Sequence, residues 1–232
     1  MLKIMKNTIL IYMSIVLLAM SACKKDDYKR DGGPSSPFVD MTTYDYLKSN
    51  HSFDSLVKVI DKAGLKDVVN GDITLFATTN YGIADYVKAK KFQKSLQIGK
   101  ENFDFGIKDI PSQELSDSLK TYLFAGKINR DQISLAGKLY NSLLGAIPNV
   151  QYLIKFRRTF EYNQYLNYVD YVTYTKVTGT RDDKEPDVNA IPDDQKDKSE
   201  DCQTSGIITK TGIVHVLNGN HRLFFNGQSL GN

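Results

Sequence analysis

Apolar residues recur at helical spacing in the first third of the chain. One run of them falls at the i, i+3, i+4, i+7 positions that line a single helix face: Phe53, Leu56, Val57, Ile60 and Ala63. Ser52 is a favourable N-cap before this run, and Gly64 is a favourable residue to end it. We therefore predict a helix over 52–63, with a short helical turn before it at 43–47 and a half-turn after it at 65–69.

Two further helices are predicted in the first half of the chain. A short β-prone run at 73–77 comes first, and Asn80 can cap the helix that follows it. Residues 88–102 are rich in Lys and poorly periodic, so we expect a helix end followed by a loop there. Another helix begins at Pro111 and ends at Gly126. Its apolar side is formed by Leu115, Leu119, Tyr122 and Leu123.

The pattern changes after residue 132, where apolar and polar residues begin to alternate. The β-prone segments lie at 134–139, 151–160, 168–177, 206–210, 212–217 and 221–225. Residues 161–167 are typical of a turn that joins two strands, whereas 179–206 show no periodicity. Because helices gather in the first half and strands in the second, the sequence favours an α+β fold. We expect a mostly antiparallel or mixed sheet rather than alternating βαβ units.

The N-terminal 22 residues have the pattern of a secretory signal peptide. Lys3 and Lys6 form a positive start, and the uncharged run at 9–22 is short for a membrane span, which needs about 20 apolar residues. The run ends in small residues directly before Cys23. This spacing resembles the bacterial lipobox, although Met20 stands where that motif prefers Leu. The alternative is a soluble secreted protein in which the cysteine is incidental.

The lipobox resemblance implies that the mature chain begins with an acylated Cys23. Several acyl chains on one residue would anchor the protein firmly in a membrane. Residues 23–42 would then form a lipidated flexible tether, since they are polar and rich in Gly, Pro and Ser. Residues 23–27, CKKDD, resemble the surface-export signal of some Gram-negative lipoproteins. We therefore expect an outer-membrane protein on the cell surface, or alternatively one that faces the periplasm. Cys202 then has no cysteine to pair with in the mature chain, so we expect it to be a free thiol.

Composition and charge narrow the function classes. The 232 residues include 30 Lys and Arg against 27 Asp and Glu, which gives a net charge of +3. This excess is too small for a protein that must neutralise many phosphates, so we expect no nucleic-acid partner. Two cysteines cannot build a disulfide-rich scaffold or a four-thiolate metal site.

Two stretches resemble the signatures of the fasciclin domain. Residues 74–80, TLFATTN, are similar to the first signature, in which a threonine, an apolar residue and Phe-Ala-Pro-Thr-Asn run from a strand into a helix. Residues 212–218, GIVHVLN, resemble the second, Asn-Gly-Val-Ile-His-Val-Ile-Asp. The sequence departs from the family at Thr78, Thr211 and Asn218, where the family has Pro, Asn and Asp. The family's intermediate Tyr-His motif is missing, so an integrin-type role is not carried over.

This resemblance implies both a fold and a role. It implies one α+β domain at 43–230, in which N-terminal helices pack on a wedge of mostly antiparallel or mixed sheet, with an insertion loop at 179–206. The motif residues, to which it gives a structural role, are Thr74, Phe76, Ala77, Thr79, Asn80, Gly212 and His215. Phe76 would lie in the core, while Thr79 and Asn80 would bond the first free N–H groups of the next helix.

The family's adhesive role implies a non-catalytic module that binds a protein or a polysaccharide. The alternative is a structural accessory of an outer-membrane assembly that takes up nutrients such as glycans. Under both hypotheses, we expect the protein to contact the membrane through the lipid on Cys23.

Candidate catalytic residues lack the partners that catalysis needs. His215 is either a catalytic base or a core histidine held by a hydrogen bond. The second is favoured because no nucleophile or carboxylate is spaced to work with it. His51 and His221 are expected on the surface or in loops, and no H-E-x-x-H zinc motif occurs. Residues 227–231 match G-x-S-x-G, but only Asn232 follows, which leaves no place for the acid and the histidine of a nucleophile elbow. We predict no enzymatic activity, no cofactor and no metal.

Two clusters of residues leave alternatives open. Nine acidic residues lie between 181 and 201, and a mobile, solvated insertion is favoured over a calcium site. Six tyrosines gather around the predicted hairpin: Tyr152, Tyr162, Tyr165, Tyr168, Tyr171 and Tyr174. They pack in the core and across strands, or they form a platform for stacking glycans if several of them face solvent.

Overall fold

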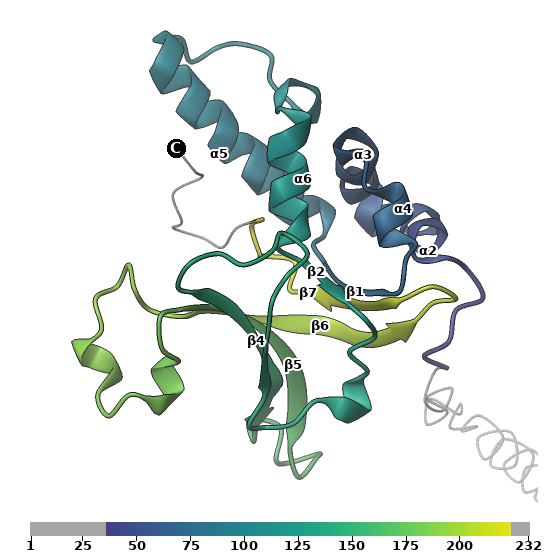
Figure 1. The fold of residues 1–232 in the computed structure, drawn as a ribbon, viewed down its shortest axis with the longest axis vertical. Coiled ribbons are helices and arrows are strands. Elements are labelled where there is room, and N and C mark those ends of the chain that lie inside the picture. The colour runs from purple at the N-terminus through teal and green to yellow at the C-terminus, as the bar shows by residue number, and fades with distance from the viewer. Residues whose placement is uncertain (1–35, 224–232) are drawn as a thin grey trace, which may run out of the picture. The chain divides into compact units, whose positions relative to one another are not determined.

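The computed structural model describes residues 36–223. Its helices are α2 (Thr43–Ser49), α3 (Asp54–Ala63), α4 (Lys66–Val69), α5 (Asn80–Ile98) and α6 (Ser112–Lys120). Its strands are β1 (Ile73–Ala77), β2 (Leu123–Ala125), β3 (Lys138–Tyr140), β4 (Val150–Thr159), β5 (Val169–Thr178), β6 (Lys198–Ile208) and β7 (Ile213–Leu217). Short 3₁₀ helices lie at His51–Phe53, Ile107–Asp109, Arg130–Gln132, Asp182–Lys184 and Val188–Ala190. The predicted α+β class is confirmed, and Figure 1 shows the helices gathered beside β1, β2 and β7.

The strands form one mixed sheet in the order β2-β1-β7-β6-β5-β4-β3. β1 and β7 run parallel, and the other neighbours run antiparallel. The long strand β6 joins the two parts of the sheet, because its first half pairs with β5 and its second half with β7, with register shifts between Cys202 and Ile207. The two fasciclin-like stretches therefore lie side by side, with Phe76 opposite His215.

Several predicted elements match the structure closely. β1 occupies 73–77 as expected, and the predicted hairpin is formed by β4 and β5. α3 ends at Gly64, whose φ of 67° is the left-handed conformation that suits a glycine C-cap. Its start differs from the prediction, because Ser52 lies in a 3₁₀ turn and α3 begins at Asp54. The Asn50 side chain caps that turn by accepting a hydrogen bond from the Ser52 N–H.

Two predictions about the helices were wrong. The predicted loop within 88–102 is mostly helix, because α5 continues to Ile98 before it ends at Gly99. Only its first turns are buried, so the rest of the helix carries no apolar periodicity. The helix predicted to reach Gly126 ends at Lys120 instead. The residues after it form β2, where Phe124 pairs with Thr74 of β1.

The predicted insertion loop at 179–206 is shorter than expected. Its last third, from Lys198, belongs to β6, which pairs with β5 and with β7. The first predicted strand of the second half, 134–139, is reduced to β3. The last predicted strand, 221–225, is not a strand at His221–Leu223, and its final two residues lie outside the described residues.

The last residues of the predicted tether at 23–42 are paired with the end of β6 instead of extending freely. The Val39 N–H donates to the Ile208 carbonyl at 2.8 Å, and the Lys210 N–H donates to the Met41 carbonyl at 2.8 Å. Phe38 forms a parallel bridge with Ile208. Residues 37–41 thus belong to the folded part, although the predicted domain start is residue 43, because this backbone finds partners at the end of β6.

The predicted signal peptide at 1–22, Cys23 and the G-x-S-x-G match at 227–231 lie outside the described residues. Within the part of the chain that the structure describes, no helix has both the length and the apolar character to cross a membrane.

Aromatic rings fill the centre of the core. Phe76 is 1% exposed, as predicted, and its ring centroid lies 5.6 Å from that of Phe124 and 5.1 Å from that of Tyr174. Tyr152 stacks on Tyr174 at 5.4 Å, so β4 and β5 contribute to the same cluster as β1 and β2. Offset and edge-to-face contacts of this kind add to the free energy gained from burial.

Gly82 lies where α5 approaches the chain that follows β7. A Cβ atom at this position would stand 2.1 Å from the His221 carbonyl oxygen and 2.2 Å from Thr78 Oγ1. Gly82→Ala should therefore lower the free energy of unfolding by about 1–3 kcal/mol, because an added methyl group strains a packed site. Urea denaturation measures the effect. Gly106→Ala is the matched control, since nothing lies within 4 Å of a Cβ there, and equal midpoints for the two variants would contradict this close approach.

Candidate functional site

The motif residues on β1 support the fold. Thr74 is fully buried, and its hydroxyl donates to the Gly126 carbonyl and accepts from the Ile128 N–H, both at 2.8 Å. Ala77 is also buried. These contacts hold the chain after β2 against β1, so the first motif acts here as a structural element.

His215 lies inside the core and is held by two hydrogen bonds. Its Nδ1 accepts from the Gly206 N–H at 3.2 Å, and its Nε2–H donates to the Ile128 carbonyl at 3.1 Å. The ring stacks on Phe76, with 5.0 Å between the centroids. Burial lowers the pKa of His215 to about 4, so the imidazole is neutral at physiological pH. These contacts match the core histidine that the sequence favours over a catalytic base.

The roles predicted for Thr79 and Asn80 at the start of α5 were wrong. Thr79 is the N-cap residue but forms no side-chain cap bond, and its buried hydroxyl has no hydrogen-bond partner among residues 36–223. The Asn80 side chain instead accepts from the Ser55 N–H and donates to the His51 carbonyl. It therefore links α5 to the start of α3, a long-range contact that local cap signals do not reveal.

Gly212 marks a close approach between the chain before β7 and β1. A Cβ there would lie 2.5 Å from the Ile73 carbonyl oxygen, and the Gly212 N–H donates to Thr209 Oγ1 at 2.9 Å. A side chain at this position would push the two strands apart, so the second motif also serves packing.

His221 lies in a loop, one of the two places predicted for it, but it is buried in the core rather than on the surface. It is buried, its Nε2 lies 2.8 Å from the Tyr122 hydroxyl, and its Nδ1 lies 3.5 Å from a Glu200 carboxylate oxygen. His51, in contrast, is exposed as expected. Sequence alone could not place His221, because the residues that enclose it come from distant segments.

Cys202 is a buried free thiol, and burial raises its pKa.

Carboxylates of the acidic segment are engaged within the loop and with its flanks. Asp182 and Asp197 each accept a hydrogen bond from the backbone N–H of the other. Hydrogen bonds from Arg181, with a smaller contribution from Lys155, hold the pKa of Asp183 well below its usual range. Within residues 36–223, no group of three His, Cys, Asp or Glu side chains is placed to hold a metal ion.

Five of the six tyrosines of the hairpin divide into two groups. Tyr152 and Tyr174 lie in the core, whereas Tyr162, Tyr165 and Tyr168 face solvent. The sixth, Tyr171, is half-buried. The exposed tyrosines lie with two other large apolar residues in the loop that joins β4 to β5. We call this group the aromatic tip, and it consists of Phe160, Tyr162, Tyr165, Leu166 and Tyr168. β4 and β5 extend away from the helices, so the aromatic tip lies far from α5 and α6 (Figure 1).

The loop that carries the aromatic tip is ordered by its own hydrogen bonds. The backbone N–H groups of Tyr165 and Leu166 both donate to the Tyr162 carbonyl, and the Asn163 N–H donates to the Phe160 carbonyl. The loop begins with a hydrogen bond from the Glu161 N–H to Thr159 Oγ1. These hydrogen bonds order the backbone that carries the exposed rings.

Two arginines at the end of β4 pack on tyrosines near the tip. The Arg158 guanidinium lies 3.5 Å from the Tyr168 ring centroid and forms two 2.8 Å hydrogen bonds to the Asp170 carboxylate. The Arg157 guanidinium lies 5.0 Å from the Tyr171 ring centroid and is paired with Asp201. Hydrogen bonding to Asp170 raises the pKa of Arg158 and lowers that of Asp170 in turn. The guanidinium groups are thus fixed in place as well as charge-balanced.

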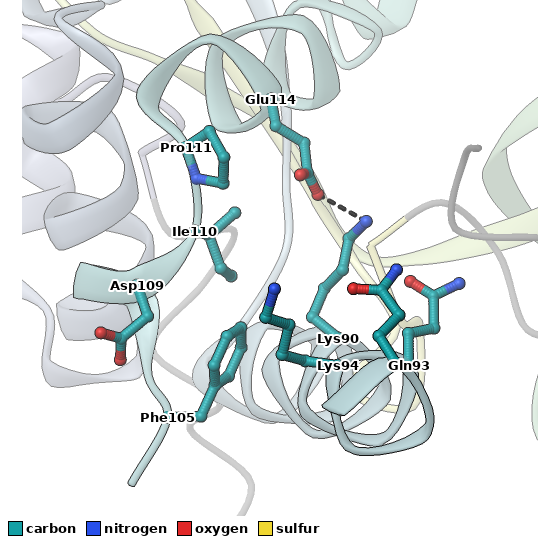
Figure 2. A pocket seen from close by; sticks show the side chains of 9 residues that line it. Lys90, Gln93, Lys94, Phe105, Asp109, Ile110, Pro111 and Glu114 are labelled. Atoms are coloured by element: carbon teal, nitrogen blue, oxygen red, sulfur yellow. Dashed lines mark ion pairs between the residues drawn. The ribbon is translucent and has the colours of Figure 1, made fainter. Parts of the chain in front are cut away.

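A hollow of about 290 Å³ lies between α5, α6 and the segment that joins them. Figure 2 shows Lys90, Gln93 and Lys94 of α5 facing this hollow, with Glu114 of α6 across from them. Lys90 is paired with Glu114 at 2.6 Å, and Glu114 also accepts a hydrogen bond from the Tyr86 hydroxyl. The charges of Lys90 and Glu114 are thus paired with each other across the hollow.

The comparisons with known proteins concern the fold. No protein-family model matches the chain, and no curated protein matches it. Among solved structures, the chain is similar to a FAS1 domain pair from the insect cell adhesion molecule fasciclin I, with 10% identity and a TM-score of 0.47. The match covers 80% of this chain and 51% of the other, so the chain spans about half the length of the structure that it matches. A likeness at this identity assigns neither a ligand nor an activity.

Proposed function

We propose that the chain is a lipid-anchored, surface-exposed module of a bacterial outer membrane that binds a protein or a polysaccharide without catalysing a reaction. The observation that carries this proposal is the aromatic tip, which gathers large apolar side chains in solvent. Tyr165, at 85% exposed, is the most accessible of them. Contiguous exposed apolar patches often mark sites of interaction with another molecule.

The hairpin behind the aromatic tip is braced against the rest of the sheet. Arg130, which precedes β3, donates to the Asp170 carbonyl at 2.9 Å and to Ser205 Oγ at 2.8 Å. Its guanidinium also packs on the Phe156 ring at 4.8 Å from the centroid. A surface that is held in place before binding loses less conformational entropy when the ligand arrives, which favours a binding role.

Attachment of whole cells tests the binding role. Changing Phe160, Tyr165 and Leu166 to Ser removes three of the five large side chains of the aromatic tip but leaves the charges of the hairpin unchanged. Cells that carry this triple variant should attach several-fold less than wild-type cells to glass coated with gelatin, mucin or cell-wall polysaccharide. Phe92→Ser is the control, since Phe92 is 63% exposed on α5 and distant from the tip. Equal attachment of all three strains on every coating would overturn the proposal.

The anchor rests on the uncharged run at 9–22 and on Cys23. Cys23→Ala should move the protein from the membrane fraction to the soluble fraction, because acyl chains supply the membrane affinity. Fractionation with metabolic labelling by a fatty acid measures both the location and the acylation. A wild-type chain that is not acylated, or a variant that stays in the membrane, argues against a lipid anchor. Protease added to intact cells then distinguishes the cell surface from the periplasm.

The alternative function, a structural accessory of an outer-membrane uptake assembly, is favoured by a second exposed surface. Phe92 and Leu96 lie one turn apart on α5 and are both exposed, as is Tyr81 three turns earlier. If this face meets another subunit, Phe92→Ser combined with Leu96→Ser should impair nutrient uptake while the triple variant of the aromatic tip does not. The reverse result supports the binding module.

A further inference from the structure

We propose that the ligand of the aromatic tip is an uncharged polysaccharide, whose sugar rings stack on Tyr165 and Tyr168. This inference deepens the proposed binding function and rests on it. It is carried by the charge balance of the tip, by its fixed aromatic face, by its amide groups and by its small area.

The charges at the end of the hairpin cancel. The charged residues within 157–170, which span the end of β4, the loop and the start of β5, are Arg157, Arg158, Glu161 and Asp170, two of each sign. The Asp170 carboxylate accepts two hydrogen bonds from the Arg158 guanidinium, and Asp201 forms an ion pair with Arg157. A polyanion is bound by cations that are free to pair with it. The tip holds its guanidinium groups in existing ion pairs, so its chemistry suits a ligand without charge.

One aromatic face of the tip, that of Tyr168, is set before a ligand arrives. Arg158 covers one face of the Tyr168 ring, and its two hydrogen bonds to Asp170 hold it there. Tyr168 is nevertheless 47% exposed. The face of an aromatic ring is electron-rich and attracts groups with partial positive charge. The axial C–H groups of a sugar ring provide such groups over a flat area that matches one tyrosine.

Polar residues that suit sugar hydroxyls lie between the aromatic residues in the sequence of the loop. Asn163, Gln164 and Asn167 are all exposed in the same loop as Tyr162 and Tyr165. Each amide offers both donors and acceptors, as a sugar hydroxyl does, and carries no charge. The loop therefore alternates surfaces for stacking with groups for hydrogen bonding, an arrangement that fits successive sugars along a chain.

The size of the tip argues against a protein as the ligand. A stable protein–protein interface buries about 800 Å² on each partner and uses roughly 20–30 residues a side. The exposed loop runs only from Phe160 to Tyr168 and stands apart from the helical half of the molecule (Figure 1). This area suffices for a few sugar rings, and many anchored copies on one cell would add up to firm attachment to a repeating polymer.

Affinity electrophoresis of the full-length chain in mild detergent tests the inference. The gels contain uncharged dextran, mannan, xylan or a β-glucan, or the anionic polymers polygalacturonate and heparin. Wild type should be retarded by at least one uncharged polymer. Tyr165→Ala and Tyr168→Ala should each raise the dissociation constant about threefold to tenfold, in line with the strength of aromatic contacts. The double variant should migrate freely.

Two controls keep the result interpretable. Tyr168→Phe retains the ring and should retain most of the binding, and Phe92→Ala removes an exposed ring elsewhere and should bind like wild type. Unchanged melting midpoints show that the tip variants are folded. Retardation by anionic polymers alone, by no polymer, or by an uncharged polymer irrespective of the double variant would each overturn the inference.

The cell-attachment experiment separates this inference from the proposed function. If attachment to gelatin depends on the aromatic tip while no polysaccharide retards the protein, the binding module stands and its ligand is a protein. If attachment never depends on the tip, both proposals fail together.

Discussion

Phe76→Ala should lower the free energy of unfolding by about 3–5 kcal/mol, the usual cost of removing a buried aromatic ring. Phe76 lies at the centre of the core, where its ring contacts those of Phe124, Tyr174 and His215. These partners come from β2, β5 and β7, so the cavity left by the ring would open between strands that are far apart in sequence. The urea midpoint should fall accordingly, with little change in the slope of the transition.

Phe92→Ala is the matched control for this effect. It removes the same atoms from a ring that is 63% exposed on α5, so the free energy of unfolding should change little. Phe76→Leu should lie between the two, because it retains most of the buried volume. If Phe76→Ala and Phe92→Ala shifted the midpoint equally, the core position of the first motif would be contradicted.

The elements that the sequence predicted well are determined by local sequence patterns. α3 has a buried face at helical spacing and a glycine at its end, while β4 and β5 alternate on either side of a short loop. The elements that were missed depend on distant partners. β2 continues the apolar spacing of α6 and becomes a strand only because β1 lies beside it. The beginning of β6 is polar and acidic, and it is held in the sheet by its pairing with β5.

The candidate site was only partly predictable, for a related reason. The tyrosine cluster is visible in the sequence, but which of its tyrosines are buried and which are exposed depends on where the strands end. Tyr152 and Tyr174 lie on the buried face of paired strands, while Tyr162 and Tyr165 lie beyond the last paired residues, Thr159 and Val169. The stacking of Arg158 on Tyr168 could not be foreseen, because it needs Asp170 opposite the arginine in the strand register.

His215 should make the stability of the fold depend on pH in the mildly acidic range. Burial lowers its pKa to about 4 from an ordinary value of 6.5, whereas the unfolded chain regains the ordinary value. Between these two values the unfolded state binds more protons than the folded state. The free energy of unfolding therefore falls as the pH decreases from 6.5 to 4, by up to about 3 kcal/mol from this residue. Above pH 6.5 its contribution is constant.

The contribution of His215 is isolated by comparing pH profiles rather than absolute stabilities. His215→Gln is expected to be less stable at neutral pH, because it disturbs the bonds to Gly206 and Ile128. Its free energy of unfolding should nevertheless fall less steeply between pH 6.5 and 4 than that of wild type. His51→Gln is the control, since it makes the same substitution at an exposed histidine. Parallel profiles for wild type and His215→Gln would mean that the buried imidazole is protonated as readily in the folded chain as in the unfolded one.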